Sequence, residues 1–77
     1  MEIKEFIEHF AEQFDETDEE LLTADTKFKD LEEWSSLIAL SVIAMIDEEY
    51  DVEVKGDDIR NSDTIADLFE AVKAKQG

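Results

Sequence analysis

The chain has 77 residues, of which 23 are Asp or Glu and 7 are Lys or Arg, so its formal net charge is −16. Ordinary nucleic-acid binding is excluded, because affinity for phosphate backbones comes mainly from Lys and Arg, and docking on an anionic membrane surface is disfavoured for the same reason. The chain contains no Cys, which excludes disulfides and thiolate nucleophiles. Without a long apolar run or a signal-peptide pattern at the N-terminus, we expect a cytoplasmic, monomeric protein in which residues 1–77 form a single domain.

Residues 1–14 predict an amphipathic helix. Its apolar side chains recur at helical spacing on one face, as Ile3, Phe6, Ile7, Phe10, Ala11 and Phe14. A stripe of this kind is typical of a helix that faces a core. The only histidine, His9, falls on the polar face, where we expect a solvated side chain rather than a ligand or a general base.

Residues 15–34 predict a long connection. Thr17 and Glu20 have the spacing of a capping box for a short turn. The apolar anchors of this stretch are Leu21, Leu22, Phe28 and Leu31. Because long loops without structure are uncommon in compact domains, the spaced anchors favour an ordered loop.

Residues 35–50 predict the second long helix, with Ser35 as its N-cap. At about 100° per residue, the arc that we assign to the core holds Ala39, Val42, Ile43, Ile46 and Tyr50. The opposite side carries Leu37, Ser41, Ala44 and Glu48, flanked by Ile38, Leu40 and Met45. A helix that is apolar nearly all round is either enclosed or presents an apolar surface to a partner.

The last third of the chain predicts two further helices. Residues 51–55 alternate like a strand, but no second strand is available, so an extended connection is expected. After a break at Gly56, residues 57–61 suit a short helical turn. Ser62 or Asp63 is expected to cap a last helix whose buried face is Ile65, Leu68, Phe69 and Val72. The prediction is an all-α fold, a small four-helix bundle of three main helices and one short one, with a long loop between helices one and two.

Catalytic and metal-binding motifs are weak in this sequence. A Ser-His-Asp site would need His9 to reach a serine, and so short a chain has little room for an oxyanion hole and a substrate pocket. An EF-hand loop starting at Asp51 would place Gly56 correctly, but its closing Glu position holds Ser62. We therefore expect no enzyme and no specific metal site.

The start of the second helix carries the pair Ser36-Leu37, preceded by Trp34 and Ser35. Here the sequence resembles the acyl carrier protein and peptidyl carrier protein family, in which a Ser-Leu pair opens the second helix. The similarity extends over essentially the whole chain, including the loop anchor at 28–31 and the acidic segment at 47–54. The chain departs from the family where the usual Asp before the attachment serine is Ser35, and where the preceding loop is one residue longer. Trp34 is expected to pack within this loop.

The resemblance implies a protein that carries acyl groups as thioesters on a 4′-phosphopantetheine arm attached to Ser36. It implies a phosphopantetheinyl transferase as one partner, and acyl-transferring or condensing enzymes with basic patches as others, in fatty acid, polyketide or related biosynthesis. The residues expected to contact these partners are Leu37, Ile38, Ser41, Ala44, Met45 and Glu48. The alternative is a cofactor-free acidic adaptor, a degenerate carrier that binds a basic and apolar groove on another protein.

Overall fold

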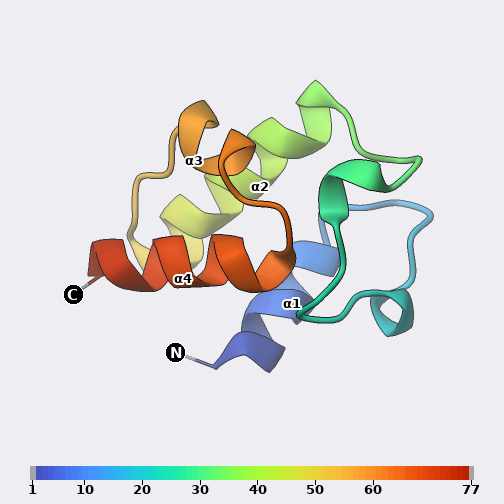
Figure 1. The fold of residues 1–77 in the computed structure, drawn as a ribbon, viewed down its shortest axis with the longest axis horizontal. Helices are drawn as coiled ribbons and strands as arrows, with labels where there is room; N and C mark the ends of the chain where they lie inside the picture. The colour runs from blue at the N-terminus through green and yellow to red at the C-terminus, as the bar shows by residue number, and fades with distance from the viewer. Residues whose placement is uncertain (1, 77) are drawn as a thin grey trace.

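A computed structural model describes residues 2–76, and in this part of the chain all regular structure is helical. The α-helices are α1 (Ile3–Ala11), α2 (Ser36–Tyr50), α3 (Gly56–Arg60) and α4 (Ile65–Gln76). Two 3-10 helices, η1 (Glu19–Leu21) and η2 (Phe28–Asp30), lie in the long connection between α1 and α2 (Figure 1). The predicted bundle, with three main helices, one short helix and a long first loop, is confirmed. No helix within residues 2–76 is both long and apolar enough to cross a bilayer.

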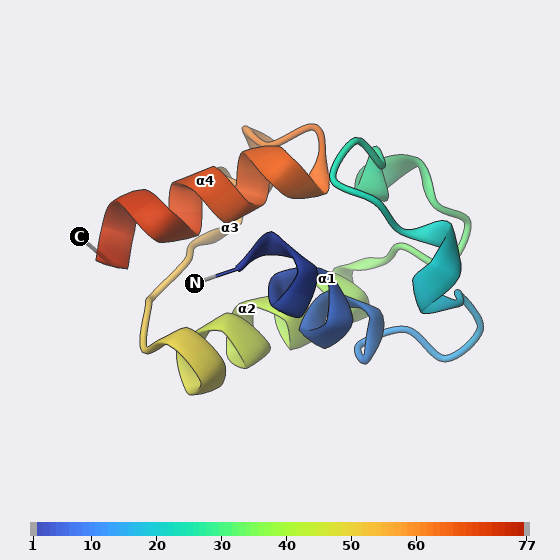
Figure 2. The ribbon, with the colours of Figure 1, turned by 90° about the horizontal axis from the view of Figure 1, so that it is seen from below.

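The core is organised around the aromatic stripe of α1. This helix contacts both α2 and α4 and lies between them in Figure 2. Phe6 and Phe10 are fully buried, and the Phe6 ring lies 5.5 Å from Phe69 of α4 and 5.8 Å from Tyr50 of α2. Phe14 is also buried, although α1 ends before it. The predicted core face of the first helix is therefore confirmed.

The α1–α2 loop is ordered, as its apolar anchors predict. Leu22 and Phe28 are buried, but Leu21 is 67% exposed and is not an anchor, because two adjacent leucines at the end of a tight turn cannot both face the core. The expected capping box is also wrong, since η1 begins at Glu19 and its N-cap residue, Asp18, makes no side-chain cap hydrogen bond. Farther along the loop, two backbone carbonyls accept the amides that open α4: Ala24 from Ala66 at 2.9 Å and Thr26 from Ile65 at 3.1 Å.

The segments that follow α2 close the bundle. The connection at 51–55 is extended, as expected, and it buries Val52 and Val54 in the core. Gly56 does not break the chain but begins α3. The predicted face of α4 is confirmed, since its buried residues are Ile65, Leu68, Phe69 and Val72.

The start of α4 is capped by Thr64, which was not among the residues expected to cap it. Thr64 Oγ1 accepts the Asp67 amide at 3.2 Å, and the Asp67 carboxylate accepts the amides of Asp63 and Thr64 at 3.1 and 3.2 Å. This reciprocal pattern is a capping box. Ser62 is instead buried, and its Oγ donates to the Asp58 carbonyl at 2.8 Å. The expectation of a cap at Ser62 or Asp63 is thus wrong by one or two residues.

Candidate functional site

Two consecutive serines build the start of α2. Ser35 is extended, with φ −154° and ψ 173°, and its Oγ accepts the Ile38 amide at 3.3 Å. The Ser35 carbonyl accepts the first intrahelical bond, from the Ala39 amide at 2.9 Å. Ser35 is therefore the N-cap, as predicted, and Ser36 is the first helical residue. The amides of Ser36 and Leu37 precede that first bond, so they point out of a helix end that favours an anion.

The first half of α2 is open to solvent along one side. Ser36 is exposed, and the large apolar side chains of Leu37 and Leu40 are 76% and 62% exposed. The first fully buried residue of the helix is Val42, which lies almost two turns beyond its start. The hydroxyl of Ser36 is therefore accessible to a modifying enzyme.

Ser36 lines an open groove of about 560 Å³ between α2, α3 and η2. The apolar lining consists of Trp34, Ala39, Leu40, Ile43, Gly56 and Ile59. A Cβ placed on Gly56 would have no atom within 4 Å, so this part of the groove is open. The charged lining residues are Lys29 and Arg60, and no acid among the described residues joins them. In a chain with 23 acids, this composition sets the groove apart from the rest of the surface.

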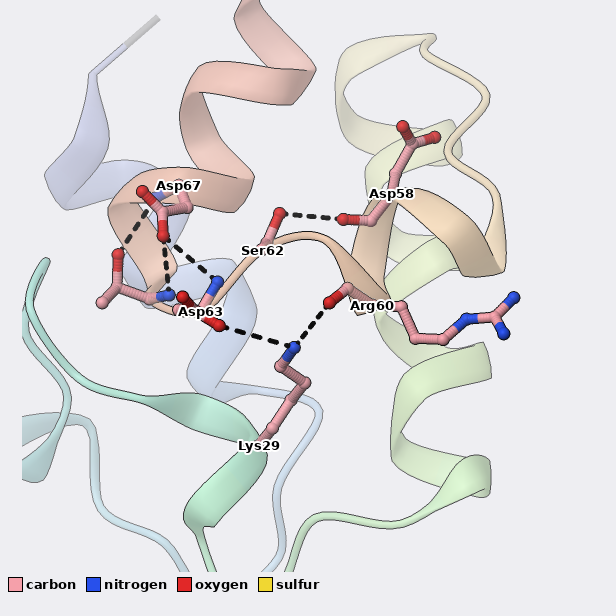
Figure 3. Close-up of polar contacts among 7 residues, drawn as sticks. Lys29, Asp58, Arg60, Ser62, Asp63 and Asp67 are labelled. Atoms are coloured by element: carbon pink, nitrogen blue, oxygen red, sulfur yellow. Dashed lines mark hydrogen bonds and ion pairs between the residues drawn. The ribbon is translucent and has the colours of Figure 1, made fainter.

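Lys29 connects two walls of this groove, as Figure 3 shows. Its Nζ donates to the Arg60 carbonyl at 2.8 Å and lies 3.9 Å from the Asp63 carboxylate. The Arg60 side chain extends away from Lys29 and pairs with Asp57. The Arg60 carbonyl lies at the C-terminal end of α3, where helical amides no longer satisfy carbonyls. The lysine therefore caps α3 and ties it to η2.

Trp34, which precedes the two serines, is packed into the loop as predicted. Its ring lies 5.0 Å from Phe28 in an edge-on arrangement and stacks at 6.5 Å on Phe10. A third aromatic ring, that of Phe14, lies 6.4 Å away. Aromatic pairs in this range add stability beyond the area they bury. The segment before Ser36 is thus anchored in the core through one large side chain.

A second anchor of this segment is the carboxylate of Glu33. It accepts the backbone amides of Asp15 at 2.7 Å, of Glu16 at 3.0 Å and of Thr17 at 3.0 Å. The Thr17 hydroxyl donates to the same carboxylate at 2.9 Å. We call this set of contacts the Glu33 clasp. No local pattern in the sequence signals it, because the donors are backbone groups 16–18 residues away.

The clasp changes the ionisation of Glu33. Partial desolvation raises the pKa of this carboxyl group, but the hydrogen bonds from the three amides and the hydroxyl lower it further, and the net pKa lies below the ordinary 4.5. Hydrogen bonds donated to a carboxylate stabilise its charged form. Glu33 is therefore a fixed negative charge whose ligands are backbone dipoles.

The residues expected to contact partners do not all lie on one surface. Those that are exposed are Leu37, Ser41, Ala44 and Glu48. Ile38 is half-buried against the core, and Met45, at 5% exposure, is not outward-facing as expected. The buried row of α2 is Val42, Met45 and Ile46. Because the helix is apolar nearly all round, periodicity could not fix its rotation, and the true inner face is turned toward Met45.

His9 of α1 lies beside the C-terminal end of α2, and Ser36 lies at the opposite end of that helix. Its Nε2 is 3.6 Å from the Glu49 carboxylate, and its Nδ1 is 3.6 Å from that of Glu12. The side chain is only 23% exposed, because its ring meets Tyr50 edge-on at 6.0 Å, so the expectation of a fully solvated histidine is wrong. Since Ser36 and Glu49 are separated by about 20 Å of helix, His9 and Ser36 do not form a catalytic pair.

Tyr50 completes this far end of α2. Burial, followed by the charges of Glu5 and Glu49, raises the pKa of its phenol to about 12. Its hydroxyl oxygen is buried and has no hydrogen-bond partner among the described residues. The far end of α2 is thus a packed and charged region, unlike the open start that carries Ser36.

Comparison with known proteins identifies the family. A family model for the phosphopantetheine attachment site matches residues 4–72, so the chain belongs to this family of carrier domains. No curated protein and no solved structure matches the chain. Its covalent cofactor is 4′-phosphopantetheine. Domains of this family are generally carriers rather than catalysts, and they work with phosphopantetheinyl transferases and biosynthetic enzymes.

The residues at the start of α2 fit such a cofactor. Attachment through a phosphodiester needs an accessible hydroxyl, and Ser36 has one. The phosphate would lie at a helix N-terminus, where backbone amides and the helix dipole stabilise an anion. The adjoining groove, with an apolar lining and two bases, can receive the arm that extends from the phosphate.

Proposed function

We propose that Ser36 is the attachment residue of the 4′-phosphopantetheine arm, and that residues 1–77 act as one monomeric, cytoplasmic acyl carrier domain. The observation that carries this proposal is the position of Ser36, which is exposed at the first residue of α2 and lines the groove between α2 and α3. Ser35 lies beside it but its Oγ already accepts the Ile38 amide. Ser35 is therefore a cap, and Ser36 offers the available hydroxyl.

Loading exchanges one phosphate ester for another. The Ser36 Oγ attacks the β-phosphorus of coenzyme A, the bond from this phosphorus to the bridging oxygen breaks, and 3′,5′-ADP leaves. The hydroxyl proton goes to a base on the transferase. The chain contributes a helix end that stabilises the resulting phosphodiester, and it needs no acid or base of its own. Ser35 in place of the usual Asp does not impair this capping role.

The arm supplies the thiol that carries acyl groups as thioesters, in a chain that contains no Cys. We place the protein in fatty acid, polyketide or related biosynthesis, as a substrate presented to other enzymes rather than as a catalyst. Its charge of −16 favours partners with basic patches, because complementary charge accelerates encounter.

We further propose that partners dock on the exposed side of α2 around Leu37, Leu40, Ser41 and Ala44. Support comes from the exposure of two leucines there and from the absence of any charged residue between Ser36 and Ile46. The acids of the helix begin only at Asp47. The matching partner surface has an apolar centre, which meets this row, and a basic rim, which meets the acids beyond it.

The attachment is tested by intact mass after incubation with coenzyme A and a broad-specificity phosphopantetheinyl transferase. Wild type and Ser35→Ala should each gain one phosphopantetheine group, and Ser36→Ala should gain none. If no added group is found with several transferases, the cofactor-free adaptor becomes the better hypothesis for the function. If the group is retained in Ser36→Ala, another residue carries the arm.

Docking is tested with two variants on the same helix, assayed for the rate of loading over a series of salt concentrations. Leu40→Asp should weaken productive binding at every salt concentration, because it places a charge in the apolar centre. Glu48→Lys should mainly slow association at low salt, where steering operates. Ile38 and Met45 are unsuitable, since their side chains pack inward. Unchanged or faster loading of Leu40→Asp would contradict the apolar docking surface.

A further inference from the structure

The Glu33 clasp joins two distant segments without the help of opposite charge. Its carboxylate receives three successive backbone amides and one hydroxyl from residues 15–17. The receiving stretch, residues 15–20, holds five acids and no base. Like charges therefore repel this contact, and the hydrogen bonds must outweigh the repulsion. A contact that persists against repulsion is a specific constraint on the segment that contains Glu33.

That segment sets the position of Ser36. On the following side, Ser36 and Leu37 are exposed, Ile38 is half-buried against the core, and the first fully buried residue of the helix is Val42. On the preceding side, the Trp34 ring is packed against Phe28 at 5.0 Å. The backbone at 31–34 also makes a turn with a hydrogen bond of 3.1 Å. The start of α2 is therefore held from both sides, by Ile38 within the helix and by Trp34 and the clasp in the preceding loop.

We propose that Glu33 is a positioning residue for the attachment of the arm, and that its clasp holds the segment before α2 so that Ser36 meets the transferase in one geometry. This inference rests on the proposed role of Ser36. Transfer from coenzyme A requires Oγ to approach the phosphorus in line, and a misplacement of about 1 Å in such a reaction can cost about 100-fold in rate. When the clasp opens, the segment at 31–35 keeps its apolar contacts through Leu31 and Trp34 but loses its polar anchor, and the hydroxyl samples more positions.

The test compares Glu33→Gln with Glu32→Gln. Both variants remove one negative charge from neighbouring residues, but only Glu33 binds the amides of residues 15–17. Gln at position 33 keeps the size of the side chain and loses the charge that four donors stabilise. A third variant, Thr17→Val, removes one donor and leaves Glu33 in place. It separates a role of the clasp from a direct contact between Glu33 and the transferase.

The primary measurement is the loading rate with coenzyme A at a temperature where all variants are folded by circular dichroism. Glu33→Gln should lower kcat/KM by about 10- to 100-fold, mainly through kcat, and Glu32→Gln should leave it unchanged. Thr17→Val should lower it less, by roughly threefold, because it removes one of the four donors to the carboxylate and leaves the three backbone amides in place. In nuclear magnetic resonance spectra of the unloaded chains, the amide signals of residues 15–17 should move in Glu33→Gln and stay in place in Glu32→Gln.

The outcomes separate this inference from the proposed function. Wild type that accepts no arm refutes the role of Ser36, and the role of Glu33 falls with it. Wild type loaded at Ser36, with Glu33→Gln loaded at the same rate, refutes the role of Glu33 alone. Slow loading of Glu33→Gln with normal loading of Thr17→Val would also overturn the clasp, since it would indicate a direct contact with the transferase.

Discussion

The two ends of α2 perform different tasks although they belong to one continuous helix. At its start, Ser36 and Leu37 are exposed, and no charged side chain occurs before Asp47. At its end, the Tyr50 ring lies 5.8 Å from the buried Phe6, and Glu49 lies 3.6 Å from His9 of α1. The start is open and held by the preceding loop, and the end is packed against a neighbouring helix.

This difference shows how a small carrier domain can be modified without loss of its fold. Ser36, the proposed attachment residue, is exposed at the start of the helix, so a large group added there would displace no packed side chain. The buried residues of the helix begin at Val42 and continue with Met45 and Ile46, in the row that faces the core. Function and stability are therefore separated along the length of α2. Mutations in the first half should affect loading and docking more than stability, and mutations in the second half should affect mainly stability.

The largest effect is expected from a buried residue of the second half. Ile46 is fully buried, so Ile46→Ala should lower the free energy of unfolding by about 2–5 kcal/mol, through lost burial and the cavity that remains. The matched truncation Leu40→Ala removes a 62% exposed side chain and should change stability by no more than about 0.5 kcal/mol. Urea denaturation of both variants measures the contrast. Similar losses in the two variants would show that the two halves of α2 are not separated in this way.

A smaller effect, in the stabilising direction, is expected at the residue that ends α2. Asp51 is left-handed, with φ 54° and ψ 42°, and its amide donates to the Asp47 carbonyl at 3.0 Å. Asp51→Gly should raise the free energy of unfolding by about 1 kcal/mol, because it removes the cost of this conformation and a negative charge at the negative end of the helix dipole. A rise in Tm of about 4–8 °C would follow for a domain of this size. Asp51→Asn removes the charge and keeps a side chain that tolerates the left-handed region, and a gain equal to that of Asp51→Gly would exclude the backbone contribution.

Salt should stabilise the protein by a further, smaller amount. Asp47, Glu48 and Glu49 crowd the last turns of α2, where each negative charge costs roughly 0.3–1 kcal/mol at low ionic strength. Screening over about 10 Å at 0.1 M salt reduces this cost. Tm should therefore rise with NaCl and rise more with Mg²⁺, and the increase should be smaller in Glu48→Gln. A Tm that responds to neither salt would mean that the clustered charge does not limit stability.

The smallest effect on stability is expected at acidic pH, and it arises from Glu33 in the loop that holds the start of α2. The folded-state pKa of Glu33 lies below its ordinary value of 4.5, so the unfolded chain binds more protons between these two values. The clasp therefore contributes its full stability above about pH 4.5, and this contribution is lost as the pH falls through the folded-state pKa. The difference in urea midpoint between wild type and Glu33→Gln should shrink over that window. A difference that is constant with pH would show that the charge of Glu33 does not contribute.

Two other carboxyl groups should behave in the same way. The main cause of the lowered pKa of Asp58 is the hydrogen bond from the Lys55 amide, at 3.0 Å. The main cause of the lowered pKa of Asp67 is the hydrogen bond from the Asp63 amide. Both ordinary values are 3.8, so these contributions are lost below about that pH. Asp58 and Asp67 lie at the starts of α3 and α4 and not at the clasp. Their titration should therefore leave unchanged the pH dependence of the difference in urea midpoint between wild type and Glu33→Gln.

The sequence predicted those parts of the fold that rest on local patterns. The stripes of the first and last helices are strongly amphipathic, and the cap at Ser35 follows from a serine next to a long apolar run. The rotation of α2 could not be predicted in this way, because apolar residues surround it and only the contacts with other elements choose its buried face. Met45 was misplaced for this reason.

The contacts that hold the site in place could not be predicted from the sequence, for a different reason. Lys29 binds a backbone carbonyl of α3, and Glu33 binds backbone amides at the start of the loop. Backbone groups are present at every residue, so nothing in the side-chain pattern marks the ones that will be used. The motif therefore proposes Ser36 as the attachment residue, and no motif predicts the contacts that hold the segment before it.

Trp34 gives the molecule a built-in optical probe. It is the only tryptophan of the chain, it stacks on Phe10 and meets Phe28 edge-on, and it lines the same groove as Ser36. Indole emission depends on the polarity and contacts of its surroundings, so the intensity and wavelength of this one fluorophore report on the groove without any label. Occupation of the groove by a flexible appendage, and its withdrawal, should be visible in the emission of a single side chain as they occur.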